Sequence, residues 1–495
     1  MLNSAIEREV VRPSLPSGIR GLEWWAAGSG AAVGAVLMLL AHRALGDDAW
    51  ITLGYVRNLA EHGHWGLLAD RVSNTQTSPL NAWLLTALFA VVGRPAVAVG
   101  LLLMVTFALT GWWTAKISRD LAVPSILPFL AVGLLASSPL LVSAIGMETY
   151  LGIAMMVGAA RHALAGNRWA AGVLWGLAVL CRPDFVVPAG VLVVGLLRPG
   201  ARSRWLPPAH AAGTGALVAL PWHVWSWFHL GGFVPDSTFI KVTSPGGVTM
   251  VDAPVRFFFV LLPVPTIITA VPVVVALLCG LRAWRRRGEA WARAALVLLA
   301  AGWLHWAALA VIGAFPEAWY FAPLVAFSFL SLAVVLAQAR TTFGLVAAFA
   351  FGTACIAASG PTPWSVMPLV LNHAETGQYQ QVGAEVRELT GGKQVLAPGE
   401  IGVLSYFSGG LIVDHFGDPA LTKVLLDERY AEAGTLGKVV LGWNWRHFPE
   451  APMPQFDYVL AFKRIVPDLP GQVVRTWQVG TPARGQDELV LLKVS

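Results

Sequence analysis

Long apolar segments separated by short polar connectors fill the first 360 residues of the chain. A run of roughly 18 or more apolar residues is long enough to cross the hydrocarbon core of a bilayer as a helix. The pattern therefore predicts a polytopic α-helical membrane protein. The apolar runs lie at about residues 24–45, 79–93, 95–115, 121–145, 149–163, 169–181, 183–198, 206–230, 255–281, 292–313, 319–338 and 341–359.

The charged connectors predict how these runs are oriented. Cytoplasmic loops carry an excess of lysine and arginine, so the basic connectors are expected inside. They hold Lys116, Arg119, Arg161, Arg168, Arg198, Arg202, Arg204, Arg282, Arg285, Arg286, Arg287, Arg293 and Arg340. This orientation requires that 79–93 does not span, and we interpret it as an interfacial or re-entrant helix. About eleven spans remain, with the N-terminus in the cytoplasm and the C-terminus outside a plasma (inner) membrane.

The end of the chain has a different character. Short β-like runs occur at 393–398, 410–414, 457–462 and 488–494, and a helical pattern at 378–390 precedes them. Strands that alternate with helices are typical of an α/β domain. We therefore predict a membrane domain at 1–360, whose outer loop 46–94 carries interfacial helices, and a soluble extracytoplasmic α/β domain at 361–495.

Composition agrees with a membrane location and narrows the function classes. Hydrophobic residues make up 56% of the 495 and charged residues 13%, against about 25% charged in soluble proteins. The net charge of +6 is explained by the basic connectors, so a nucleic-acid partner is not expected. The three cysteines lie inside apolar runs and indicate neither a disulfide framework nor a metal cluster.

Ionisable residues near the membrane gather on the predicted outer side. Such groups are costly at this depth and are functional candidates by default. They come from separate loops that would meet on one face, which predicts a single outer pocket lined by carboxylates and a few cations. The residues are Asp47, Asp48, Glu148, Arg182, Asp184, Asp236, Lys241 and Glu317.

Two adjacent carboxylates follow the first apolar run, in "LGDDAWITLGYVRNLAEHGHW" (45–65). One interpretation is that Asp48 caps a helix beginning at Ala49, which would explain a single carboxylate. The other assigns one aspartate as general base for an acceptor hydroxyl. The second would then bind a divalent cation (Mg, Mn or Ca) or position the acceptor. Asp48 is the candidate metal ligand.

The remaining candidates also have structural alternatives. Glu148 suits a helix N-terminus. Arg182 and Asp184 suit a local ion pair around a proline turn, whereas a free arginine matches phosphate geometry. Lys241 is either a solvated loop lysine or a second phosphate cation. Aromatic residues beside Glu317 suit an interfacial belt or a sugar face. The scattered histidines His62, His64 and His305 are expected to be solvated or core residues rather than metal ligands.

Six segments in order resemble the GT-C superfamily of membrane glycosyltransferases. They are "DDAWITLGYVRNLAEHG", "NTQTSPLNAWLLTAL", "GMETYL", "LCRPDF", "PDSTFIK" and "AWYFAP". The chain is most similar in look to the actinobacterial terminal arabinofuranosyltransferase-like branch, which "APGEIGVLSYFSGGLIVDHFGDP" (397–419) also resembles. It departs from that branch at Gly54, at Asp236-Ser237 and at Glu317, which leaves the sugar and the acceptor open.

The resemblance implies an inverting transfer of a sugar, with arabinofuranose favoured, from polyprenyl phosphate to an envelope glycan or glycolipid outside the membrane. It implies Asp47 as base, Asp48 as metal ligand or acceptor positioner, with roles that can be exchanged, and Glu148 as an orienting group. Arg182 and Lys241 would stabilise the leaving phosphate. The implied substrate contacts are Tyr55, Arg57, Asp184, Asp236, Glu317, Trp319, Tyr320, Glu400 and Asp414.

Three other functions compete with this one. A mannosyl-, hexosyl- or aminoarabinose-type transferase of the same superfamily differs only in the donor. A lipid-sugar flippase or transporter predicts inverted repeats and ionisable groups within the spans, and only Arg43 and His305 come near to that pattern. A non-catalytic scaffold would leave the outer carboxylates without a common purpose.

Overall fold

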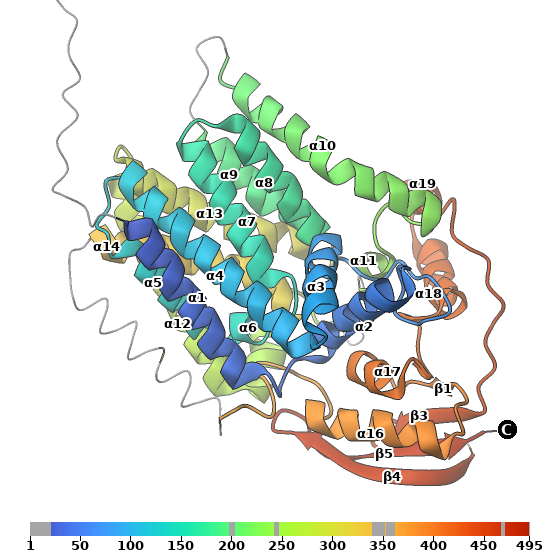
Figure 1. The fold of residues 1–495 in the computed structure, drawn as a ribbon. Helices are drawn as coiled ribbons and strands as arrows, with labels where there is room; N and C mark the ends of the chain where they lie inside the picture. The colour runs from blue at the N-terminus through green and yellow to red at the C-terminus, as the bar shows by residue number, and fades with distance from the viewer. Residues whose placement is uncertain are drawn as a thin grey trace, which may run out of the picture.

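The computed structural model describes residues 21–197, 203–241, 247–338, 352, 362–466 and 471–494. A bundle of helices lies above a smaller region that holds the β-sheet (Figure 1). The mostly helical architecture is confirmed. The predicted span at 341–359 lies almost entirely outside the described residues, as do Arg198, Arg202 and Arg340.

The bundle holds the helices up to residue 338, and several of them have proline in their first turn. In chain order they are α1 (Leu22–Ala41), α2 (Asp47–His62), α3 (Pro79–Val92), α4 (Pro95–Asp120), α5 (Leu127–Ser137), α6 (Pro139–Val142), α7 (Thr149–Leu164), α8 (Arg168–Cys181), η1 (Pro183–Phe185), α9 (Val186–Leu196), α10 (Leu206–His229), α11 (Asp236–Ile240), η2 (Pro254–Phe259), α12 (Pro263–Arg285), α13 (Ala290–Val311), η3 (Ala318–Phe321) and α14 (Ala322–Gln338).

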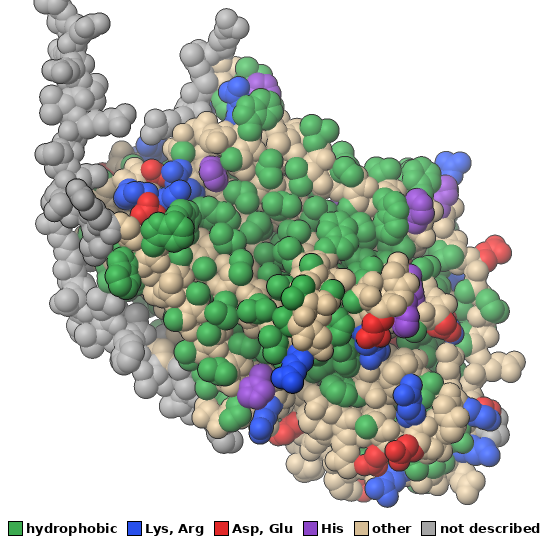
Figure 2. Space-filling model, in the orientation of Figure 1, with side chains coloured by type: hydrophobic (Ala, Val, Ile, Leu, Met, Phe, Trp, Pro, Cys, Tyr) green, Lys and Arg blue, Asp and Glu red, His purple; other side chains and the backbone are tan. Residues whose placement is uncertain are grey.

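Five helical segments of the described chain are long and apolar enough to cross a membrane: Leu22–Ala41, Pro95–Asp120, Pro263–Arg285, Ala290–Val311 and Ala318–Gln338. Figure 2 shows apolar side chains over the middle of one face of the bundle, and more of the charged side chains toward the lower right. The predicted runs 121–145 and 255–281 are not single helices. Each is interrupted before a proline, Pro139 and Pro263, because proline cannot continue the preceding helix. The total of about eleven spans stays a prediction.

Small residues let the first spans pack backbone to backbone. A Cβ atom on Gly30 of α1 would lie 2.3 Å from the carbonyl oxygen of Phe107 in α4, and one on Gly111 would lie 2.3 Å from that of Ala26. Close approach of this kind is typical of helix pairs in membranes, where small residues take the place of large apolar ones at the interface. α3, in turn, has 14 residues and lies beside α2 at the end of the bundle that faces the sheet (Figure 1).

The C-terminal region combines the sheet with short helices. Its elements are α16 (Thr376–Leu389), β1 (Val395–Leu396), α17 (Gly402–Ser408), β2 (Ile412–Val413), α18 (Pro419–Glu432), α19 (Thr435–Asn444), β3 (Tyr458–Phe462), β4 (Gln472–Thr481) and β5 (Gly485–Lys493). The strand order is β2-β1-β3-β5-β4. β1 is parallel to β2 and β3, whereas β5 is antiparallel to β3 and β4. The four predicted β-runs overlap β1, β2, β3 and β5, and β4 was not predicted.

Candidate active site

The first turn of α2 carries the paired carboxylates at the end of the bundle that meets the C-terminal region. The helix begins at Asp47, and Gly46 is its N-cap without a side-chain hydrogen bond. The interpretation of Asp48 as a helix cap is therefore wrong, because Asp48 lies inside the helix. The two side chains take different partners: Asp47 is buried against the C-terminal region, whereas the Asp48 side chain is 31% exposed.

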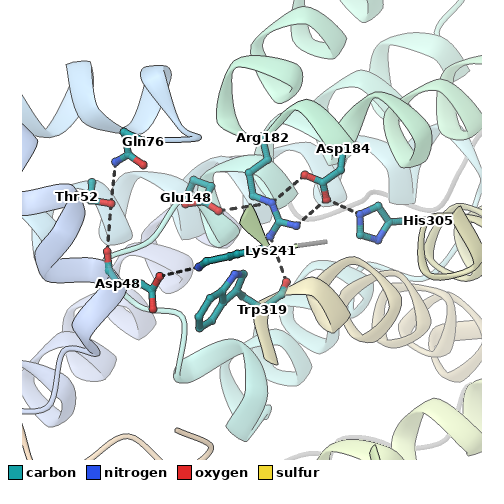
Figure 3. Close-up of polar contacts among 9 residues, drawn as sticks. All are labelled: Asp48, Thr52, Gln76, Glu148, Arg182, Asp184, Lys241, His305 and Trp319. Carbon is teal, nitrogen blue, oxygen red and sulfur yellow. Dashed lines mark hydrogen bonds and ion pairs between the residues drawn. The ribbon is translucent and has the colours of Figure 1, made fainter. Parts of the chain in front are cut away.

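Lys241, directly after α11, lies against Asp48 (Figure 3), and both residues line a cavity. Its Nζ atom lies 3.4 Å from Oδ1 of Asp48. The ammonium group also lies 5.1 Å from the ring centre of Trp319 and 5.5 Å from that of Phe416. Aromatic faces attract a cation and help to hold it in place. Lys241 is thus fixed by one carboxylate and two rings, and it lines the cavity.

Arg182 lies deeper and its hydrogen-bond donors are engaged by the protein (Figure 3). Its Nε and Nη2 atoms donate to the two carboxylate oxygens of Asp184 at 3.0 and 2.6 Å, and Nη1 donates to the carbonyl oxygen of Trp319 at 3.3 Å. Oε1 of Glu148 lies 3.7 Å from Nε. The structure therefore contains the local Arg182–Asp184 ion pair that was one of the two interpretations.

Glu148 reaches this cluster from the corner between α6 and α7. Gly146 takes a φ of +93° at the corner, and a Cβ atom there would lie 2.8 Å from the Cβ of Ala49. A larger residue would both strain the backbone and push α2 away. Glycine thus allows the "GMET" corner to close against the first turn of α2.

His305 of α13 supports the cluster from the side opposite the cavity. It is fully buried, and its Nε2 atom lies 2.6 Å from Oδ2 of Asp184 (Figure 3). It is therefore a core histidine that holds a carboxylate. His62 and His64 lie elsewhere, with their rings stacked on each other at 6.2 Å.

Two polar residues next to Asp48 were missed in the sequence. Nε2 of Gln76 donates to the hydroxyl of Thr52 at 2.9 Å, and that hydroxyl donates to the carbonyl oxygen of Asp48 at 3.4 Å (Figure 3). Thr52 and Gln76 both line the cavity. The available signal was spacing, because Thr52 lies one helical turn after Asp48 and hence on the same face.

The cavity has two adjoining parts that share Asp48, Lys241 and Trp319. The narrow part, of about 120 Å³, is bounded by Glu148, Arg182, Asp184 and Tyr320. The wide part, of about 450 Å³, extends toward the C-terminal region and is bounded by Asp47, Glu317, Glu400 and Arg484. The structure thus brings most of the predicted outer residues to one cavity.

Four predicted contact residues do not line either part, because protein groups hold them elsewhere. The hydroxyl of Tyr55 is hydrogen-bonded to the hydroxyls of Ser73 and Thr75. Nη1 of Arg57 donates to the carbonyl oxygen of Tyr406 at 2.8 Å. Asp236 accepts from Nε1 of Trp445 at 3.1 Å, and Asp414 accepts from the amide of Phe416 at 2.7 Å.

In the wide part, burial raises the pKa of two carboxyl groups, and neighbouring carboxylates raise the pKa of the lysine. Burial raises the pKa of Glu317 to about 7, against the opposing effect of Lys241. Burial also raises the pKa of Asp47 to about 8, and the Glu400 carboxylate adds to the rise. Burial alone would lower the pKa of Lys241, but Asp48 and Glu317 hold it above its ordinary value. Lys241 is therefore a permanent cation at the boundary of the two parts.

The residues around Asp48 do not form a ligand set for a divalent cation. Within the described ranges, no group of three or more His, Cys, Asp or Glu side chains is arranged to hold a metal ion. Asp48 instead faces the ammonium group of Lys241. Mg²⁺ and Ca²⁺ need several oxygen ligands, and Asp48 supplies a single carboxylate.

Comparisons with known proteins find similarity to this chain in structure and not in sequence. No family model matches the sequence, and no curated protein sequence matches it. Apo ArnT from Cupriavidus metallidurans aligns over 95% of this chain and 98% of its own, with 15% identity and a TM-score of 0.52. The undecaprenyl phosphate complex of the same ArnT aligns over the same shares, with 13% identity and a TM-score of 0.49.

The second protein of similar structure has a longer chain. The arabinofuranosyltransferase AftD from Mycobacteria aligns over 96% of this chain, with 14% identity and a TM-score of 0.52. The match spans 40% of the AftD chain. The two alignments with a TM-score of 0.52 extend over nearly all of this chain and bear on its fold. The chain therefore shares its fold with ArnT and with the aligned part of AftD.

Proposed function

We propose that the protein is an inverting glycosyltransferase that moves a sugar from a polyprenyl-phosphate donor to an envelope glycan or glycolipid. The observation that carries this proposal is the Asp48–Lys241 pair, a carboxylate and an ammonium group 3.4 Å apart in a cavity at one end of an apolar bundle. The cavity would open to the outer face of the plasma membrane. A donor whose lipid stays in the bilayer would present its sugar at that depth.

Asp48 is the base in this proposal, so the expected roles of the two aspartates are exchanged. A general base needs a lone pair that points at the acceptor hydroxyl. Both oxygens of Asp47 accept backbone N–H groups, whereas Asp48 is partly exposed and faces the cavity. Asp48 takes the hydroxyl proton as the acceptor oxygen attacks the anomeric carbon. The bond from that carbon to the phosphate oxygen breaks, and polyprenyl phosphate leaves.

Lys241 stabilises the charge that develops on the leaving phosphate. Its ammonium group is positively charged and lines both parts of the cavity. A donor phosphate competes with Asp48 for this cation, and binding of the donor thereby frees the base. Arg182 keeps its donors on Asp184 and Trp319 and therefore holds the cavity wall in place rather than binding the phosphate. Charge stabilisation of this kind is commonly the largest single contribution to catalysis.

The sugar and acceptor are proposed on the resemblance, which favours arabinofuranose. Trp319 and Tyr320 lie beside Arg182 and Lys241, and aromatic faces suit the apolar face of a sugar ring. The wide part of the cavity, between the bundle and the C-terminal region, would receive the acceptor. Glu317 offers a hydroxyl-binding group there, whereas the Glu400 carboxylate is held by His373 and Tyr379.

The test is transfer of radiolabelled sugar from a panel of polyprenyl-phosphate donors to membrane acceptors. Asp48→Asn is expected to reduce transfer by roughly 10²–10⁴-fold, because the general base is lost. Asp427→Asn, on the exposed face of α18, is the matched control and should transfer normally. A chelator is expected to leave the rate unchanged. Equal transfer by Asp48→Asn and the intact protein would refute the proposal.

A further inference from the structure

The adjacent aspartates of α2 have opposite surroundings, and Asp47 joins the bundle to the C-terminal region. Its Oδ2 atom accepts the amide N–H of Gly402 and its Oδ1 atom that of Val403, both at 2.9 Å. These amides belong to the first turn of α17, where backbone N–H groups lack partners within the helix. The Asp47 residue is 6% exposed. Its carboxylate is thus a buried cap for a helix more than 350 residues away in sequence.

The two helices approach so closely that only glycine fits between them. A Cβ atom on Gly402 would lie 2.0 Å from the carbonyl oxygen of Asp47 and 2.8 Å from the amide nitrogen of Ile51. Both are backbone atoms of α2, and neither can move aside without moving the helix. Gly402, the second glycine of the "GEIG" segment, therefore has a steric role that its sequence context did not indicate.

Further contacts fix the same pair of helices. The ring of Trp50 meets the rings of Tyr406 and Phe407 edge-on, at centroid distances of 4.8 and 4.9 Å. The guanidinium group of Arg57 lies 4.3 Å from the ring centre of Tyr406 while it donates to the carbonyl oxygen of that residue. The contacts with α17 therefore run along α2 from Asp47 to Arg57.

We infer that docking of α17 onto α2 positions the Asp48 carboxylate, with Asp47 as the positioning residue. Asp48 follows Asp47 directly, so a clamp on the backbone at Asp47 and Ile51 sets the direction in which the Asp48 side chain points. Asp47 itself need not touch the reacting atoms. The C-terminal region would then complete the active site from outside the bundle. This inference rests on the proposed function in assigning Asp48 as the base.

A displaced base should slow the chemical step and leave donor binding intact. A misplacement of about 1 Å at a reacting group can cost about a hundredfold in rate. Asp47→Ala and Gly402→Ala are therefore expected to lower kcat by about a hundredfold with the donor KM unchanged. Asp47→Asn keeps one acceptor oxygen and should show a smaller loss. Gly377→Ala in α16 is the matched control, because its Cβ would meet nothing within 4 Å.

The experiment combines these kinetics with amide hydrogen exchange on the full-length protein in detergent. Faster exchange at residues 48–53 and 402–408 in Asp47→Ala and Gly402→Ala, with normal exchange in Gly377→Ala, is the expected result. Unaltered exchange in both variants would overturn the inference, whatever the transfer rates. A higher donor KM with unaltered kcat would overturn it too, since Asp47 would then bind substrate. Failure of the intact protein to transfer any sugar would instead refute the proposed function, and exchange would still report the docking.

Discussion

The two cations of the cavity, Arg182 and Lys241, have the same charge and opposite situations. Arg182 is 2% exposed and gives its donors to Asp184 and Trp319. Lys241 lines both parts of the cavity, and its ammonium group lies 3.4 Å from Oδ1 of Asp48. A cation that is already saturated organises its surroundings, whereas a cation with an exchangeable partner can take a substrate phosphate. The difference predicts that one residue acts on stability and the other on catalysis.

Removal of the Arg182 charge should have the largest effect, and it should appear as loss of the folded protein. Arg182→Met leaves the buried Glu148 without its cation and breaks the ion pair with Asp184. Removal of one partner from a buried ion pair typically costs about 3–5 kcal/mol. We expect a large fall in Tm in detergent. Arg256→Met removes a comparable but exposed pair with Asp252, where ion pairs contribute about 0–1 kcal/mol. Equal Tm values for the two variants would contradict the organising role of Arg182.

Lys241→Met should separate catalysis from stability. The methionine preserves the contact with the Trp319 ring but removes the charge, so the leaving phosphate loses its stabilising partner. Loss of one such group typically costs about 10²–10³-fold in kcat. Transfer assays should show this loss in a protein that remains folded. Lys423→Met on the exposed face of α18 is the control, and a Lys241→Met enzyme of normal rate would remove Lys241 from the mechanism.

The same contrast explains what the sequence could reveal. Apolar runs predicted the helical bundle, because a segment in lipid must satisfy its backbone groups as a helix and must be long and apolar enough to cross the hydrocarbon core. Residue type and loop position also predicted that Asp48, Glu148, Arg182 and Lys241 would share one pocket. The sequence could not show which cation is saturated, since that depends on contacts such as Arg182 to Trp319, 137 residues apart.

The roles of Asp47 and Asp48 were equally invisible in sequence. Two neighbours on a helix point about 100° apart, as 3.6 residues per turn requires. Which of them faces the cavity depends on where α17 docks, and the two amides that bind Asp47 come from Gly402 and Val403. Strand β4 was missed for a related reason. Its first five residues are exposed, and its place in the sheet is set by pairing with β5.

The smallest predicted effect is a dependence of the transfer rate on pH, and it arises around Lys241, the cation with an exchangeable partner. Glu317 lies in the wide part of the cavity near Lys241 and Asp48, and burial raises its pKa to about 7. Below that pH the neutral acid leaves Lys241 available to phosphate. Above it the carboxylate competes for the lysine and repels the donor, so the transfer rate should fall as pH rises through about 7.

Glu317→Gln keeps the shape of the neutral acid and should remove this fall, with rates at low pH little changed. Its folded pKa also lies above the ordinary value of 4.5, so the neutral form is the one that folding favours. The contribution of Glu317 to stability is therefore fully present below pH 4.5 and is lost as pH rises to about 7. The glutamine variant should accordingly show a flatter dependence of Tm on pH across that window. Glu428→Gln, at an exposed position of α18, should keep both dependences. If the rate of Glu317→Gln still falls as pH rises, another group causes the fall and Glu317 does not compete for Lys241.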